Sequence, residues 1–257
     1  MIDSLKHRWH AKSAALLLSI ENRLGRIMLC WVALATLASI VRIAASPIHA
    51  RLPDLSVMAP YLLLIFAPAI TLVLALRWFR NGDRMPQPAT RLARVGAWRG
   101  VGSGEARSHA LYGTTGIMVS LLVGILLNVP VRAAEYFAAM PAIAGPVPVW
   151  LGTLRALMTA DVVLLSSLYT VAFVAALRRV PLFPRLLGAI WMIDLAMQML
   201  TAQLVANSPG LPPAVAGSLH ALLEGNVTKV LISVGLWLPY LLLSTRVNVT
   251  YRHRIPA

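Results

Sequence analysis

Six long apolar stretches, separated by shorter polar segments, dominate the hydrophobic pattern of the chain. Each has about the ~20 residues that a helix needs to cross the ~30 Å hydrocarbon core of a bilayer. They are expected near residues 25–45, 57–79, 110–131, 149–177, 185–206 and 217–243. The pattern therefore predicts an all-α fold, a polytopic bundle of six transmembrane helices.

Residues 1–26 carry a weaker pattern of a different kind. Leu5, Trp9, Leu16 and Ile20 recur at roughly helical spacing with basic residues between them, which favours a helix lying on the cytoplasmic membrane surface. A poorly ordered basic tail is the alternative. Cleavage as a signal peptide is not expected, because Glu21-Asn22-Arg23 stands where small residues would be needed.

Composition supports a membrane protein. The chain is 58% hydrophobic and only 12% charged, whereas soluble proteins have about 25% charged residues. The net charge of +14 is interpreted as a signal of membrane orientation, and no nucleic-acid partner is expected. Cys30 is the only cysteine, so neither an internal disulfide nor a cysteine metal site can form.

The basic residues also predict the orientation. Eighteen of the 23 Lys and Arg residues fall in the N-terminal segment, in 77–107, in the loop after the fourth span and in the tail. The opposite loops, 46–55, 135–148 and 207–213, are rich in proline, and only Arg51 and Arg132 are placed on that side. Positive charge marks the cytoplasmic side. Both termini are therefore expected in the cytoplasm, and the six spans are expected in the inner membrane of a bacterium.

The connection 77–107 contains seven arginines, prolines and glycines and is expected to be an irregular cytoplasmic loop. A plain orientation signal explains it most simply. The alternative is contact with anionic lipid headgroups or phosphate, for which Arg91, Arg94 and Arg99 are the candidates.

The C-terminal segment carries a resemblance to a known family. The sequence LWLPYLLLSTRV at 236–247, followed by Thr250-Tyr251, resembles the terminal signature of the bacterial inner-membrane family called domain of unknown function 2569. Residues 180–185 and 190–194 are also similar, whereas Thr245 departs from the basic residue common there. The resemblance implies a four-span domain at 108–257, preceded by a first hairpin with its basic loop at 27–107 and the segment 1–26. It implies no activity.

Three charged residues lie deep within predicted spans. At ~1.5 Å per residue, Asp161 and Lys229 lie about 18 Å, and Asp194 about 14 Å, from the nearer expected span end. Isolated charges at such depth are costly. The two carboxylates are therefore expected to face Lys229 inside the bundle.

Further polar residues accompany these charges. Gln198 follows Asp194 by one helical turn, and His220 precedes Glu224 by one turn, so each pair shares a helix face. Arg155 is expected to meet Glu224 at a similar depth. Two interpretations stay open: a proton relay or polar-substrate site, and buried pairs that fix helix register without adding stability.

No phosphate loop, catalytic elbow or metal-binding histidine pair is present in the sequence. We therefore expect no enzyme, no cofactor and no metal. The predicted function is a non-catalytic accessory or scaffold subunit with a membrane-protein partner, or a homo-oligomer, in contact with anionic lipids. The alternative is a small transporter or channel, for which a short similarity between 41–45 and 131–135 indicates a repeat. An enzyme acting on lipid headgroups is the least supported class.

Overall fold

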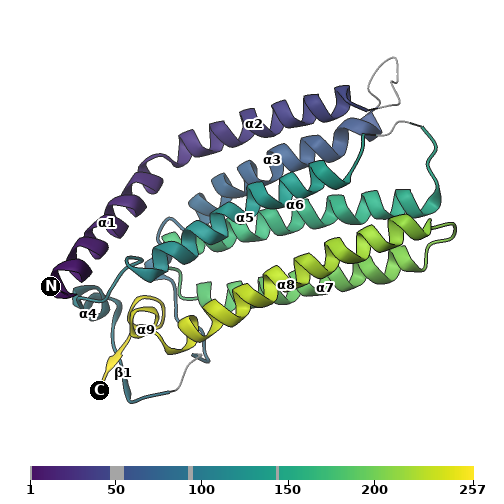
Figure 1. The fold of residues 1–257 in the computed structure, drawn as a ribbon. Coiled ribbons are helices and arrows are strands. Elements are labelled where there is room, and N and C mark those ends of the chain that lie inside the picture. Colours follow the sequence, from purple (N-terminus) through teal and green to yellow (C-terminus); the bar gives the residue numbers. More distant parts are fainter. Residues whose placement is uncertain (1, 47–54, 92–94, 143–144) are drawn as a thin grey trace.

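The structure, a computed structural model, describes residues 2–46, 55–91, 95–142 and 145–257. Six long helices run side by side (Figure 1). They are α2 (Leu24–Ala44), α3 (Leu55–Trp78), α5 (Ile117–Ala139), α6 (Val149–Leu177), α7 (Phe183–Ala206) and α8 (Pro213–Leu243). All six are long and apolar enough to cross a membrane. The chain is thus a multi-pass membrane protein with an all-α fold, which confirms the predicted fold class.

Helix α6 forms the centre of the bundle. It packs against α3, α5 and α7, and more of it is buried than of any other span. Ala172, Ala175 and Ala176 are fully buried, and such small side chains let neighbouring helices approach closely. Helices α2 and α8 lie on opposite sides of the bundle (Figure 1) and expose most of their surfaces.

The third span differs from its predicted limits of 110–131. Gly113 and Gly116 have positive φ values of 110° and 71° and hold the chain in a turn, so α5 begins only at Ile117. The helix then continues through Pro130 to Ala139, since neighbouring helices can stabilise a proline within a membrane helix. Arg132, expected in a loop, is therefore inside the bundle. The other loop cation, Arg51, lies outside the described residues.

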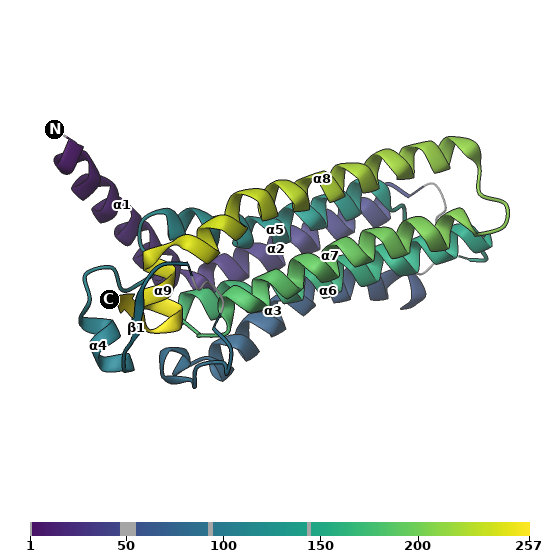
Figure 2. The same cartoon turned by 90° about the horizontal axis from the view of Figure 1, so that it is seen from below.

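The N-terminal segment is helical, as one of the two alternatives predicted. Helix α1 (Ile2–Asn22) meets α2 at Arg23 and projects away from the bundle (Figures 1 and 2). Its contacts with the bundle include a 3.2 Å bond that Glu21 accepts from Arg178 and a 2.9 Å bond that the Ser13 hydroxyl accepts from the Gly116 amide. Leu17 is also buried in the core. Its contact with a membrane surface stays a prediction.

Both chain ends lie at the same end of the bundle (Figure 1). There the connection 77–107 and the tail form the structure that we call the cap. It comprises a 3-10 turn (Gly82–Arg84), β1 (Trp98–Gly100), α4 (Ser103–Ser108), α9 (Thr245–Arg252) and β2 (Arg254–Pro256). Strands β1 and β2 pair antiparallel, with Arg99 opposite Ile255. The loop expected to be irregular is thus partly ordered by pairing with the tail.

The C-terminal signature residues fasten this cap to the spans. The Tyr251 hydroxyl donates a 2.9 Å bond to the Ala176 carbonyl at the end of α6. Arg246 donates a 2.7 Å bond to the Thr115 hydroxyl in the turn before α5. Helix α9 ends at Arg252 and is followed by His253, whose φ of 46° lies in the left-handed region. The signature therefore has a structural explanation, because it joins the end of the chain to two spans.

Candidate functional site

A group of buried polar residues joins three spans near the middle of the bundle. Arg132 of α5 is 8% exposed and donates a 2.6 Å bond to Asp161 of α6 through Nη1. Its Nη2 donates a second 2.6 Å bond to Asp194 of α7, which is fully buried. One guanidinium thus bridges two carboxylates on different helices. We call Arg132, Asp161, Asp194, Tyr169 and Gln198 the central cluster.

Neutral side chains complete the central cluster. The Tyr169 hydroxyl donates to Asp194 Oδ2 at 2.9 Å, and Gln198 Nε2 donates to Asp161 Oδ1 at 3.0 Å. Gln198 also donates to Asp194 across one helical turn, which confirms that the two share a face. Asn226 of α8 donates to Gln198 Oε1 at 3.4 Å. The hydrogen-bond network therefore reaches α8, the fourth span involved.

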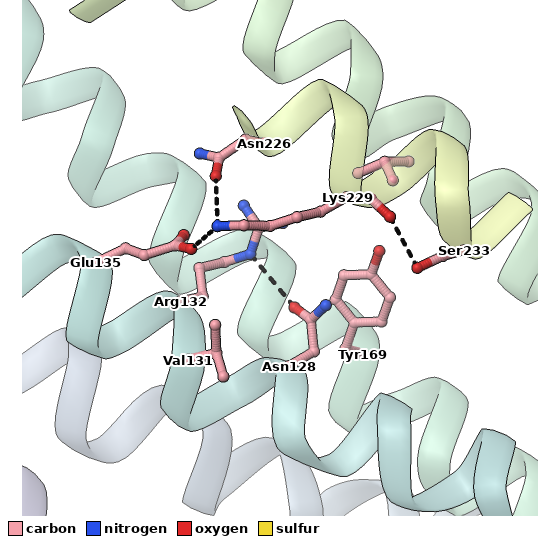
Figure 3. Close-up of a pocket in the computed structure, with 9 residues that line it drawn as sticks. Asn128, Val131, Arg132, Glu135, Tyr169, Asn226, Lys229 and Ser233 are labelled. Carbon is pink, nitrogen blue, oxygen red and sulfur yellow. Dashed lines mark hydrogen bonds and ion pairs between the residues drawn. The ribbon is translucent and has the colours of Figure 1, made fainter. Parts of the chain in front are cut away.

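A second ion pair lies nearer the surface. Lys229 of α8 donates to Glu135 of α5 and, at 3.3 Å, to Asn226 Oδ1. The Lys229 side chain is 60% exposed and that of Glu135 is 21% exposed, so the pair bridges α5 and α8 at the edge of the bundle (Figure 3).

A hollow of about 50 Å³ lies between this pair and the central cluster (Figure 3). It has room for a few water molecules, because one water needs about 10–15 Å³. Its polar lining consists of Asn128, Arg132, Glu135, Tyr169, Asn226, Lys229 and Ser233. The hollow thus gives small polar species access to the guanidinium that holds the two carboxylates.

The charges of the site do not cancel when every group is ionised. Lys229 and Glu135 neutralise each other, but Arg132 faces two carboxylates, so the central cluster keeps one surplus negative charge. Buried charge without compensation is strongly unfavourable. The arrangement can therefore do two things: fix the register of α5, α6 and α7, and take up one proton or cation.

The predicted pairing of both carboxylates with Lys229 is wrong. Arg132 takes that place, and Lys229 pairs with Glu135 instead. The error follows from ending the third span at Val131, which left Arg132 outside the membrane. Apart from Glu135, the residues after Arg132 are apolar or aromatic up to Met140. This run was the sequence signal that could have placed Arg132 within the span.

The predicted pair of Arg155 and Glu224 is not found among the described residues either. Arg155 lines a groove between α3 and α6 with Pro60 and Leu63, whereas Glu224 is exposed on α8, one turn from the exposed His220. The prediction of this pair used only the depth of the two residues along their helices. It failed because the two side chains occupy different faces of the bundle.

The structure does not bring together the three arginines that were predicted to contact phosphate. Arg91 donates a 3.1 Å bond to the Arg252 carbonyl in α9. Arg99 forms an exposed 2.6 Å ion pair with Glu105, and Arg94 lies outside the described residues. Within the described part of the chain, no group of three or more His, Cys, Asp or Glu side chains is placed to bind a metal ion.

Comparison of the chain with protein-family models, with curated proteins and with solved structures found no match.

Proposed function

We propose that the protein is a non-catalytic accessory or scaffold subunit that binds a second integral membrane protein through α8. The observation that carries the proposal is the exposure of His220, Glu224 and Lys229 on this helix. Lys229 is the seventeenth of the 31 residues of α8, and Glu224 lies about 8 Å from it along the axis. Both residues therefore lie at a depth where lipid tails surround an uncovered helix face.

Lipid cannot satisfy Glu224, whereas Lys229 is already paired with Glu135. A charged side chain at the bilayer centre costs ~3 kcal/mol or more on insertion scales, and Glu224 has no partner among the described residues. A helix of another membrane protein with a donor or cation at this depth would supply one. Polar contacts between membrane helices contribute up to about 1–2 kcal/mol each, so the α8 face fits such a partner.

Although the hollow reaches the Arg132 guanidinium, the burial of the two carboxylates behind it favours a subunit over a conduit. The side chains of Arg132 and Asp161 are each 10% exposed and that of Asp194 is 0% exposed. A buried ion-paired group of this kind can specify how helices fit together.

The membrane and the orientation are part of the proposal. The arginine-rich cap and both termini lie at one end of the bundle (Figure 1), and positive charge favours the cytoplasmic side. We place this end in the bacterial cytoplasm and the spans in the inner membrane, beside anionic lipids. The resemblance to the family of unknown function stays a prediction.

The test is crosslinking from the proposed face in native membranes. A photoreactive residue at Ile232, which is 64% exposed on α8, is compared with one at Leu29, which is 67% exposed on α2. The proposal expects a defined heterologous product from Ile232, loss of it in Glu224→Gln, and the same partner in native mass determination after mild extraction. A monomer or homo-oligomer with no heterologous crosslinked product would contradict the proposed subunit function.

A transporter remains the second candidate, because the hollow leads to a cluster with one surplus negative charge. In this mechanism Asp161 or Asp194 takes up a proton as the occupancy of the hollow changes. Reconstituted liposomes carrying a pH-sensitive dye test it. Proton flux that is lost in Asp161→Asn and retained in the exposed-residue variant Glu224→Gln would favour this candidate.

A further inference from the structure

A second basic site lies in the cap, away from the central cluster. Arg91, Arg185 and Arg252 line one narrow cleft together with Gln87, Thr90 and a rim of prolines. The three arginines come from the connection before β1, the start of α7 and the end of α9. The fold thus brings together three cations that are far apart in sequence.

Arg252 is the buried member, with 3% of its surface exposed. It donates to the Leu241 carbonyl at 2.8 Å and to Asn248 Oδ1 at 3.1 Å, and both acceptors are neutral. Burial, followed by repulsion from Arg254 and Arg185, lowers the pKa of Arg252 to about 10. Its charge is therefore desolvated, and no carboxylate in the described part of the chain forms an ion pair with it.

The other two arginines of the cleft also bond to neutral groups. Arg91 donates to the Arg252 carbonyl, and Arg185 donates to the Thr90 hydroxyl. Three described side-chain carboxylates at this end of the molecule pair with other arginines: Glu21 with Arg178, Asp83 with Arg107, and Glu105 with Arg99. Within the described part of the chain, the cleft contains positive charge and no anion.

The remaining groups suit a phosphate. Guanidinium groups bind phosphate oxygens with strong charge-assisted bonds. The Thr90 hydroxyl accepts from Arg185 and keeps its own hydrogen to donate. Gln87 Oε1 is buried with no hydrogen-bond partner among the described residues and can accept from a P–OH or a headgroup hydroxyl. The space in the cleft is about 10 Å³, about one water-sized atom, so it has room for one phosphate oxygen and not for the whole group.

We propose that the cleft of Arg91, Arg185 and Arg252 binds a phosphate group presented at this membrane surface. An anionic phospholipid headgroup and a soluble phosphate ion share this chemistry. The cleft is separate from the α8 face, so the phosphate proposal does not depend on the proposed function.

The experiment uses the full chain in phosphatidylcholine nanodiscs. Inorganic phosphate is titrated against chloride at equal ionic strength, with the thermal unfolding midpoint as readout. In parallel, nanodiscs containing phosphatidylglycerol are used, and retained lipid is counted by native mass spectrometry. The double variant Arg91→Gln/Arg185→Gln is compared with Arg80→Gln/Arg84→Gln, which removes the same charge from exposed residues of the same connection.

A midpoint raised by phosphate, or phosphatidylglycerol retained, supports the site when the cleft variant weakens binding about tenfold or more and the control does not. The first result identifies soluble phosphate as the source, and the second identifies lipid. No binding in either arm, or equal loss in both variants, overturns the proposal.

A second variant covers the case in which the double variant does not fold. Thr90→Asp keeps all three arginines and places a carboxylate in the cleft. It is expected to raise the unfolding midpoint without ligand and to abolish the effect of phosphate or phosphatidylglycerol. Unchanged binding in Thr90→Asp contradicts the proposal.

Discussion

Two buried arginines, Arg132 in the spans and Arg252 in the cap, have opposite electrostatic surroundings. Arg132 bridges two carboxylates at 2.6 Å each. Among the described residues, the Arg252 side chain bonds only to an amide and a backbone carbonyl, and burial, followed by repulsion from Arg254 and Arg185, lowers its pKa. The first site has a surplus of negative charge and the second a surplus of positive charge. Burial of an arginine therefore does not by itself indicate its role, which depends on the charges around it.

The first prediction, with the largest expected effect, removes the bridging cation. Arg132→Gln leaves two carboxylates buried together, and breaking a buried pair costs about 3–5 kcal/mol. The free energy of unfolding in mixed micelles is expected to fall by that amount. Arg178→Gln is the control, since its pair with Glu21 is about one-third exposed and such pairs contribute under about 1 kcal/mol. Equal effects of both variants would contradict the described geometry.

The second prediction concerns the surplus negative charge. Asp161→Asn or Asp194→Asn alone balances Arg132 with one carboxylate, so each is expected to cost under about 1.5 kcal/mol. The double variant leaves Arg132 buried without an anion and is expected to cost about 3 kcal/mol or more. A double-mutant cycle by chemical unfolding measures the coupling. Strict additivity would show that the two carboxylates do not share the guanidinium.

The third prediction tests the cap arginine. Arg252→Gln removes the charged donor of the Leu241 carbonyl, which costs about 1–3 kcal/mol. It also removes an uncompensated charge, so the net loss is expected to be smaller than for Arg132→Gln. Thermal unfolding in nanodiscs measures it, with the exposed Arg84→Gln as a neutral control. A loss as large as that of Arg132→Gln would mean that Arg252 has a compensating anion.

The fourth prediction, with the smallest effect, is a pH dependence in the cap. Burial, and then Arg91 and Arg107, lower the pKa of His253, while Asp83 opposes the shift. The unfolded state therefore binds more protons below the ordinary histidine value of about 6.5, so stability falls as the pH falls through that range.

His253→Asn is expected to remove this acid-side loss, of under about 1 kcal/mol, because asparagine cannot take up the proton and tolerates the left-handed φ of 46°. Unfolding midpoints between pH 7 and pH 5 measure it, with His220→Asn as a control for the loss of a histidine elsewhere. An unchanged pH slope in His253→Asn would exclude His253 as its cause.

Much of the fold was predictable because it depends on local composition. The sixth span ends as predicted at Leu243, and the fourth matches its predicted range of 149–177. The shared face of Asp194 and Gln198 was also predictable, since it follows from helical spacing alone. The third span was placed wrongly, because Arg132 looked like a boundary although, apart from Glu135, the apolar pattern continues beyond it.

The sequence by itself determined that the chain has six apolar spans and how far along their helices Asp161, Asp194 and Lys229 stand. Only the tertiary structure decided that Arg132 bridges the carboxylates and that Arg91, Arg185 and Arg252 meet in one cleft. The physical reason is that depth depends on position along one helix, whereas pairing depends on how separate helices are rotated and offset. Each residue turns a helix by about 100°, so the packing of the whole bundle selects which charges face one another.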